Sequence, residues 1–540
     1  MTTSTPTSGG PAPAADYPDH IDAAVLKIAG VVVLGAIMSI LDITVVNVAL
    51  PTFQSEFGSH GHEIAYSHVA WAVTGYTLAL ATVIPLSGWA ADRFGTKRLY
   101  MSAIFLFTAG SALCATAWDV NVLIAFRVLQ GLGGGMLMPL GMTIMTRAAG
   151  PHRMGRLMAI LGVPMLLGPI MGPILGGWLI QIASWHWIFL INVPLGAVAL
   201  VYASRVLAKD TPEPSESFDF LGMALMSPGL ALFLFGVSSL PQEGGDFSAP
   251  RVWVSMLVGF ALMAGFVWHS FRPAHPLLDL RLFRNRNLTV AVITMFMFAS
   301  AFFGGLLLVP TYFQEIRGQS TLHAGLLVAP QGLGAMITMP IAGRLVDKMP
   351  IGRITPFGIG LIVIGMFGLT QIDQSTPYAA IIAMLFVMGL GMGATMMPLF
   401  TSALKTLGAH DVARGSTLLN ITQQISSSVG VALMSVVLTN HLNSSPVIPG
   451  TEKLPQLDGG LTETGAAIQS NLRPGQIAPL HLDPALLARG LADAASSFAH
   501  TYWVAWSLVL LTLVPALMLP RRREETHLLD DEGQPPVVVS

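Results

Sequence analysis

The sequence contains a series of apolar runs that are each long enough to cross a lipid bilayer. A helix of about 20 apolar residues spans the ~30 Å hydrocarbon core, and fourteen such runs follow one another along the chain. They lie near 25–50, 67–90, 98–117, 120–142, 157–180, 186–206, 219–240, 251–271, 287–313, 323–346, 354–372, 377–400, 415–440 and 499–520. The predicted fold is therefore an all-α polytopic membrane protein with fourteen transmembrane helices.

The scarcity of charge excludes a soluble protein. Asp, Glu, Lys and Arg make up only 10% of the chain, against roughly 25% in an average soluble protein. The net charge of −2 gives no reason to expect a nucleic-acid partner. No catalytic or nucleotide-binding motif of a soluble enzyme is present, so we predict a protein that is not an enzyme, with no metal and no cofactor. Uphill transport by such a chain would need an ion gradient.

The positions of Lys and Arg predict the orientation in the membrane, because cytoplasmic loops are enriched in both. With the N-terminus inside, 21 of the 27 basic residues fall on the cytoplasmic side, five fall outside, and Arg127 lies within a span. The prediction is a multi-pass protein of the plasma or inner membrane with both termini in the cytoplasm. The bilayer is then its main surrounding, and we expect a monomeric transport unit.

An internal repeat divides the chain. The segment PLSGWAADRFGTKR at 85–98 returns as PIAGRLVDKMPIGR at 340–353, and GLGGGMLMPL at 131–140 returns as GLGMGATMMPL at 389–399. Two halves of six spans, separated by an insertion, are the architecture of a secondary transporter. The predicted units are a tail at 1–24, a six-helix bundle at 25–206, two inserted helices at 207–286, a second bundle at 287–520 with a long outer loop at 441–498, and a tail at 521–540. Within that loop, residues 482–500 have the pattern of a short amphipathic helix.

Two charges stay clearly within the predicted spans. Asp42 lies about 12 Å from the outer end of the first span, and Arg127 lies about 9–12 Å from the outer end of the fourth. A charge at this depth costs at least ~2.5–3.5 kcal/mol, and such residues pair or line a water-filled cavity. One interpretation is a fixed ion pair that orients two helices. The other is a proton-coupling pair in which Asp42 binds the proton, because Arg does not titrate usefully. Glu315 at the end of the ninth span is a weaker second candidate.

Glycine and proline patterns mark the fourth and fifth spans. Gly168, Gly172 and Gly176 recur every four residues, which permits close helix approach, and prolines in the same span permit bending. Met and aromatic residues cluster at 294–303 and at 142–145. We interpret these clusters as lipid-facing or packing residues, and the alternative is the lining of a cavity for variable apolar substrates.

Several of these motifs together resemble the major facilitator superfamily, and specifically its fourteen-span drug:proton antiporter family. The segments that carry the resemblance are SGWAADRFGTKR (87–98), FRVLQGLGGG (126–135), LLGPIMGPILGGW (166–178), LDITVVNVALP (41–51), SWHWIFLINVPLG (184–196), LVPTYFQEIRG (308–318) and NITQQISSSVG (420–430). They cover nearly the whole chain. His186 and Gln423 stand where the family usually has Arg.

The resemblance implies a mechanism and a set of roles. The two bundles would rock to give alternating access, and a cytoplasmic latch would comprise Gly88, Asp92, Arg93, Gly95, Lys97 and Arg98, with Asp347 in the repeat. The antiporter-motif helix would carry Gly168, Pro169, Gly172, Pro173, Gly176 and Gly177 and would seal against the opposite bundle. Candidate polar residues of the cavity are Asn47, Gln130, Gln314, Glu315, Asn420 and Gln423.

The predicted function is proton-coupled efflux of lipophilic or amphipathic small molecules, including drugs. The principal alternative is an exporter or flippase of an endogenous lipid or metabolite, which the long outer loop would allow. A non-transporting membrane sensor and a proton-pumping subunit of a larger complex are remote alternatives. The pumping subunit would need a chain of mid-membrane Lys, Glu and His residues, which the sequence lacks.

Overall fold

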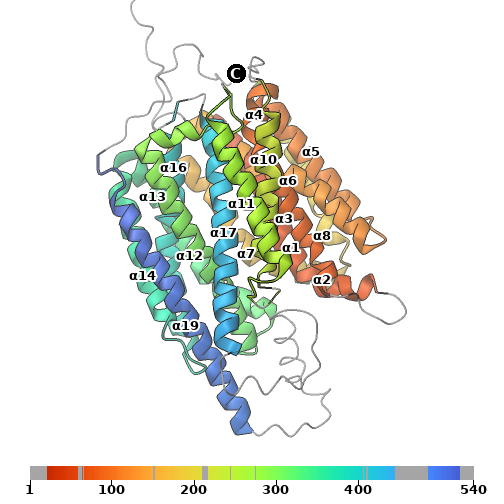
Figure 1. Ribbon diagram of the computed structural model, residues 1–540, viewed down its shortest axis with the longest axis vertical. Coiled ribbons are helices and arrows are strands. Elements are labelled where there is room, and N and C mark those ends of the chain that lie inside the picture. The colour runs from red at the N-terminus through yellow and green to blue at the C-terminus, as the bar shows by residue number, and fades with distance from the viewer. Residues whose placement is uncertain are drawn as a thin grey trace, which may run out of the picture.

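The chain is built of helices. The computed structural model describes residues 21–58, 64, 66–149, 153–209, 217–241, 243, 245–273, 275–405, 407–408, 411–443 and 484–522. Within these residues the secondary structure is helical and is joined by short connections (Figure 1). The predicted tails up to residue 20 and from residue 523, and the predicted outer loop from 444 to 483, lie outside the described residues.

The helices follow the order of the predicted spans. The first repeat comprises α1 (Ala23–Glu56), α2 (Tyr66–Val69), α3 (Trp71–Val83), α4 (Leu86–Phe94), α5 (Thr96–Cys114), α6 (Val120–Ala149), α7 (Met154–Ile182), α8 (Trp187–Leu190) and α9 (Asn192–Val206). The insertion contains α10 (Phe220–Ser239), α11 (Pro250–Ser270) and the 3-10 helix η1 (Leu280–Arg284). The second repeat comprises α12 (Arg286–Glu315), α13 (Thr321–Lys348), α14 (Ile351–Leu369), α15 (Tyr378–Gly393), α16 (Met396–Lys405), α17 (Val412–Asn443) and α19 (Pro484–Leu517).

Eleven of the helices among the described residues are long and apolar enough to cross a membrane, and the α3–α4 pair makes a twelfth. The helices α5 and α7 run beside them, since α5 packs against α6 and α9, while α7 packs against α1 and α13. The all-helical membrane fold is confirmed, and the predicted count of fourteen is consistent with this arrangement.

Three predicted spans are divided into two helices each, and the one at 186–206 is divided at Ile191 into α8 and α9. The span at 67–90 is divided into α3 and α4, which meet at an angle of 55°. Pro85 lies at the break, where it lacks an N–H for the helix ladder and its ring clashes with the preceding turn. The span at 377–400 is divided at Ala394 and Thr395 into α15 and α16. The last span differs in the opposite way, because α19 begins at Pro484 and continues through the short separate helix predicted at 482–500.

The helices cross the bundle in alternating directions, which brings the start of α1 and the end of α19 to one face. Asp22, just before α1, contacts Arg153 at the start of α7 with an N–O distance of 3.3 Å. The Gly352 N–H at the start of α14 donates to the carbonyl of Pro520, just after α19, at 3.0 Å. We call this side the terminal face and the opposite side the distal face.

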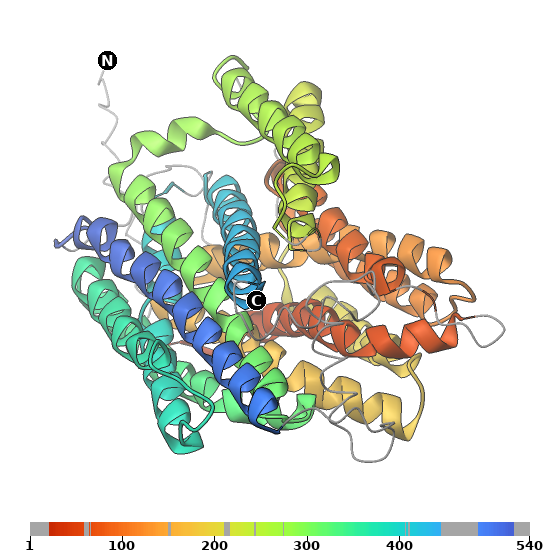
Figure 2. The same ribbon diagram turned by 60° about the horizontal axis from the view of Figure 1, so that its bottom comes forward.

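The two repeats meet along two lines of contact. On one side α7 packs against α13 and α16, and on the other α17 packs against α4 and α6. The inserted hairpin of α10 and α11 stands at the edge of the bundle, where α10 touches both α3 and α17 (Figures 1 and 2). Ile84 just after α3, Leu230 of α10 and Ile421 of α17 share one hydrophobic cluster there.

The sequence repeat is also a repeat of close glycine contacts. A Cβ added to Gly131 of α6 would meet the carbonyl oxygen of Tyr76 at 2.6 Å, and one added to Gly389 of α15 would collide with the carbonyl oxygen of Gln331. Tyr76 and Gln331 are 255 residues apart, as are Pro85 and Pro340 of the first matched segments, and Gly131 and Gly389 of the second are 258 apart. Only glycine allows backbones this close, so the same helix spacing is present in both repeats.

Candidate functional site

A buried network of charged and polar side chains lies in the first repeat. Asp42 of α1 and Arg127 of α6 are both buried, and the guanidinium Nη1 of Arg127 donates to Oδ2 of Asp42. The two residues are 85 positions apart in sequence. The α1–α6 contact therefore brings together the two charges that the sequence places at similar depth.

Two amide side chains complete the shell around the carboxylate. Gln130, one turn after Arg127, donates from Nε2 to Oδ1 of Asp42 at 2.8 Å and accepts from Arg127 Nη1 at 2.9 Å. Asn192, the first residue of α9, donates from Nδ2 to the same Oδ1 at 3.2 Å and to Ser111 Oγ at 3.1 Å. The ionised carboxylate thus accepts hydrogen bonds from one guanidinium and two amides, which compensates its burial.

Arg127 is held by a third helix as well. Its Nε donates to the carbonyl of Ala72 in α3 at 3.0 Å, and its Cζ lies 4.1 Å from the centre of the Tyr76 ring. Tyr76 is fully buried, and its hydroxyl oxygen is 3.4 Å from Ser39 Oγ. A cation over an aromatic face gains electrostatic energy, and more when both are desolvated. These contacts with α3 therefore hold the guanidinium in place independently of its ion pair with Asp42.

Aromatic side chains cover the distal side of this network. Phe53 of α1 packs edge-on against Trp185 at 5.4 Å and is stacked with Phe189 of α8 at 6.3 Å between ring centres. Phe189 lies 5.8 Å from Arg127 Cζ. All three rings are buried in one hydrophobic cluster, so the charged network is separated from the distal face by apolar packing in this conformation.

Asn192, Tyr76 and Ser111 are members of the network that the sequence analysis did not identify. Asn192 is the one amide in the apolar stretch WIFLINVPLG (187–196). An isolated amide in such a stretch was an available signal. Tyr76 and Ser111 carry no comparable signal, because Tyr and Ser are common in membrane helices.

The predicted latch residues gather at the terminal face. Asp92 of α4 is buried, and its Oδ1 lies 3.6 Å from Arg147 Nη2 at the end of α6. Gly95 has a φ of +86° between α4 and α5, a conformation for which glycine is preferred. Lys97 donates to the carbonyls of Ser204 and Leu207 at the end of α9. Arg93 is half-buried at this face and Arg98 is exposed there.

Two contacts at the terminal face join the repeats. Asp347 of α13 accepts from the Gly155 N–H at 3.0 Å and from Arg156 Nε at 3.2 Å, both at the start of α7. Ser87 Oγ of α4 is 3.0 Å from Thr417 Oγ1 of α17, and a Cβ on Gly88 would lie 3.1 Å from that same oxygen. The terminal face is therefore closed across both lines of contact.

The glycine row of α7 does not face the opposite repeat, contrary to what the resemblance implies. Added Cβ atoms at Gly168, Gly172 and Gly176 would meet Ile40, Thr44 and Val45, which all belong to α1 of the same repeat. The glycines that meet the second repeat are Gly155 and Gly162, earlier in α7. A Cβ on Gly177 would have no neighbour within 4 Å. Pro169 and Pro173 belong to α7, and their side chains lie outside the described residues.

The remaining polar candidates are dispersed. Asn47 is exposed on α1, Gln314 and Glu315 are half-buried at the distal end of α12, and Gln423 is half-buried on α17. Asn420 is buried and donates to Met142 Sδ at 3.3 Å, across the contact between α17 and α6. Of the six candidates, Gln130 alone joins the Asp42 network. Within the described part of the chain, no group of three or more His, Cys, Asp or Glu residues could hold a metal ion.

The helical bundle with this buried network is that of a polytopic membrane transport protein, and sequence comparisons identify the family. A sequence model of the Major Facilitator Superfamily matches residues 32–431. The chain is 46% identical over 513 residues to a multidrug resistance protein B homolog of Mycobacterium tuberculosis, covering 94% of this chain and 92% of that protein. It is 32% identical over 418 residues to a putative multidrug resistance protein, MdtD, of Serratia proteamaculans, covering 76% and 84%. The chain belongs to the Major Facilitator Superfamily.

Solved structures agree on the fold. The human organic anion transporter MFSD10 superposes with a TM-score of 0.59 at 14% identity, covering 90% of this chain and all of that one. The proton:xylose symporter XylE gives the same score at 15% identity, covering 93% and 98%. At this identity the likeness concerns the fold alone. Family membership makes the protein a multi-pass membrane transporter and not an enzyme.

Proposed function

We propose that this protein exports lipophilic or amphipathic small molecules, drugs among them, in exchange for protons. The relatives that are named multidrug resistance proteins support the substrate class. The observation that carries the proton coupling is the buried Asp42 carboxylate, which is bonded to Arg127, Gln130 and Asn192 within the first repeat.

Asp42 binds and releases the proton in this proposal, and the charge on Arg127 determines the energetic cost of protonating it. Protonation removes the negative charge and leaves the guanidinium buried without its counter-ion, which costs about 3–5 kcal/mol. A conformation in which water reaches Arg127 would relieve that cost. Binding a proton at Asp42 therefore favours opening of the aromatic cover formed by Phe53, Trp185 and Phe189, and releasing the proton favours its closure.

The moving parts are two bundles, which we place at 25–206 and 287–520, with the inserted pair at 207–286 between them and tails at 1–24 and 521–540. The Asp347–Arg156 and Ser87–Thr417 contacts hold the terminal face closed. The terminal face is the cytoplasmic side, because it carries most of the Lys and Arg residues. Breaking these contacts would open the protein toward the cytoplasm. One chain forms the complete transport unit.

The test is substrate-induced proton release in everted membrane vesicles that contain the full-length protein. Asp42→Asn keeps the size of the side chain and removes the titratable group, so it should abolish proton release and leave the protein inserted. Asp373→Asn is the matched control, because Asp373 is exposed in a loop at the distal face, and this variant should behave like the parent. Coupled transport that survives in Asp42→Asn would contradict the proposal.

A further inference from the structure

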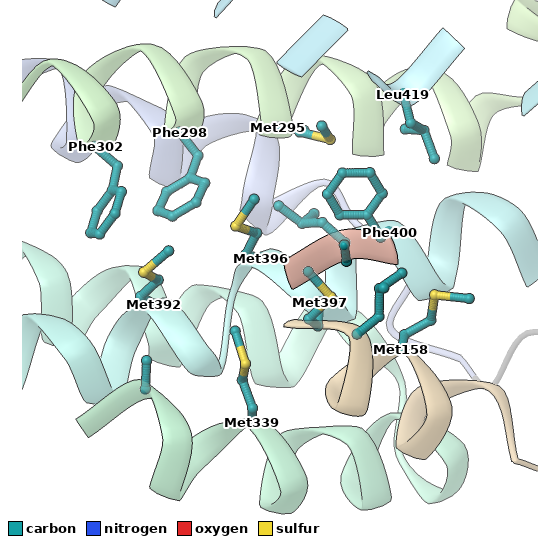
Figure 3. Close-up of a cluster of buried hydrophobic side chains, with 14 of the residues drawn as sticks. Met158, Met295, Phe298, Phe302, Met339, Met392, Met396, Met397, Phe400 and Leu419 are labelled. Carbon is teal, nitrogen blue, oxygen red and sulfur yellow. The ribbon is translucent and has the colours of Figure 1, made fainter. Parts of the chain in front are cut away.

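A methionine-rich cluster lies largely in the second repeat and reaches its junction with the first. Its members come from six helices and are all buried: Met158 of α7, Met295, Phe298 and Phe302 of α12, Met339 of α13, Met392 of α15, Met396, Met397 and Phe400 of α16, and Leu419 of α17. Figure 3 shows Met339, Met392, Met396 and Met397 gathered between the surrounding helices, with Met158 approaching from α7. No charged residue belongs to this set.

The cluster includes the line along which the two repeats touch. A Cβ on Gly162 of α7 would lie 2.6 Å from Met339 Sδ and 2.9 Å from Met397 Cγ. Methionines of the second repeat therefore rest directly on the backbone of the first. Gly162 is seven residues beyond Gly155, or about 10 Å deeper along α7 than the Asp347 contact.

The placement predicts what happens when the repeats separate. In the proposed alternating-access cycle, breaking the Asp347–Arg156 contact parts α7 from α13 and α16, and Met158, Met339 and Met397 then line the opening. Leaving apolar side chains exposed to water is unfavourable. An apolar molecule that enters from the terminal face would cover them, so the parted junction favours a lipophilic occupant.

Methionine also has the properties that such a surface needs. Its side chain is unbranched, has three rotatable bonds and carries a polarisable sulfur, so it adapts to different shapes. Surfaces of this kind are used where one protein accepts many partners. Leucine fills nearly the same volume with a stiffer, branched side chain, and Met-to-Leu exchanges in cores are well tolerated. The exchange therefore removes adaptability while keeping apolar packing.

We propose that Met339 and Met397, with Met158 opposite them, determine which lipophilic molecules this protein accepts. They form an adaptable apolar wall for rigid, bulky compounds. This inference rests on the proposed efflux function and adds the residues that select the substrate.

The test compares three probes in cells and everted vesicles that carry the full-length protein. Ethidium and tetraphenylphosphonium are rigid lipophilic cations, and hexadecyltrimethylammonium has a flexible alkyl chain. The double variant Met339→Leu/Met397→Leu should lose roughly tenfold in efflux of the rigid probes, the scale of a one-methylene misfit in an apolar pocket. The flexible probe can adapt to the stiffer wall, so its efflux should change little.

A matched control is available in the same repeat. Met388 of α15 is buried and packs on Gly365 of α14, since a Cβ on Gly365 would lie 2.6 Å from Met388 Cγ. Met388→Leu therefore tests the same exchange away from the junction, and it should leave all three probes unchanged at an equal protein level. Loss of all probes in parallel, no change in any probe, or the same selective loss in Met388→Leu would overturn the inference.

The failure of this inference is separable from failure of the proposed function. If the parent exports the probes and Asp42→Asn does not, coupled efflux stands whatever the methionine variants do. If the parent exports none of the three probes, both proposals fail together.

Discussion

The two repeats of the chain share a backbone pattern and differ in their buried chemistry. The glycine contacts match, since Gly131 meets Tyr76 as Gly389 meets Gln331, and Gly172 meets Thr44 as Gly430 meets Ser300. At the positions equivalent to Asp42, Arg127 and Gln130, these matches place Phe298, Leu385 and Met388. All six side chains are buried.

The comparison distinguishes the glycine contacts, which set the spacing of the helices, from the buried side chains beside them, which differ in chemistry between the repeats. Glycine spacing sets how closely the helices pack, and it persists in both repeats because an added Cβ would collide with the facing residue at each place. The side chains beside those glycines carry no such constraint. One repeat could therefore keep a charged network while the other became apolar, and we propose that the first serves the proton, while Met339 and Met397 of the second serve the substrate.

Replacing Arg127 by the residue of the second repeat should have the largest effect. Arg127→Leu leaves the Asp42 carboxylate buried without its counter-ion, and it should lower the free energy of unfolding by about 3–5 kcal/mol. The double variant Asp42→Leu/Arg127→Leu should recover most of this loss, yet remain unable to couple protons. Thermal unfolding of the purified proteins measures both, and equal instability of the single and double variants would contradict the ion-pair explanation.

The shared glycines should be about equally sensitive in both repeats. Gly131→Val and Gly389→Val each force a side chain against a neighbouring backbone, and each should cost about 1–3 kcal/mol of folding free energy. Gly360→Ala in α14 is the control, since a Cβ there meets nothing within 4 Å. It should be neutral or gain up to about 1 kcal/mol. Denaturation of the three variants measures these changes in the free energy of unfolding. If only one of the two valine variants were destabilised, the helix packing of the two repeats would not be equivalent.

Asn192 should contribute less than Arg127, because it is neutral and Gln130 still donates to the same oxygen. Asn192→Leu should cost about 1.5 kcal/mol, the scale of one hydrogen bond to a charged group. A double-mutant cycle with Asp42→Asn isolates that bond. A coupling energy near zero would show that Asn192 acts on Ser111 and the start of α9 rather than on the carboxylate.

The smallest effect concerns two exposed turns that the repeats also share. Asp119, before α6, accepts from the Asn121 N–H at 2.8 Å, and Asp373, before α15, accepts from the Ser375 hydroxyl and from the Ser375 N–H, each at 2.7 Å. These hydrogen bonds lower the pKa of both carboxyl groups below the usual value. Their stabilisation is therefore complete above the ordinary Asp pKa and is lost as pH falls through the lowered one.

Asp119→Ala and Asp373→Ala should each lower the melting temperature slightly at neutral pH. The difference from the parent should shrink as the pH falls, since the parent then loses the same contribution. Glu243→Ala, an exposed change in the loop between α10 and α11, should have no pH-dependent effect. A difference that persists under acidic conditions would mean that the two aspartates act by something other than charge.

Sequence reasoning reached the centre of the site and missed its surroundings. Asp42 and Arg127 can be identified from the sequence because charges are rare within the spans. Ser111 and Tyr76 cannot, because Ser and Tyr are common in membrane helices. The spacing of the glycines in α7 indicates a close-packing face, and this face meets α1 of the same repeat instead of the opposite repeat that the resemblance implies. A periodic pattern identifies a face of a helix and not the neighbour that the face meets.

The sequence by itself determined the number of long apolar runs, the repeat and the depth of the two buried charges. It could do so because the hydrocarbon core penalises every charge and fixes the length of a crossing helix, both of which are readable along one dimension. Only the tertiary structure decided how each helix is rotated about its axis and where Pro85 bends its span. That rotation depends on the side chains of all neighbouring helices at once. It is what brings Asn192 to Asp42 and Met339 to Gly162.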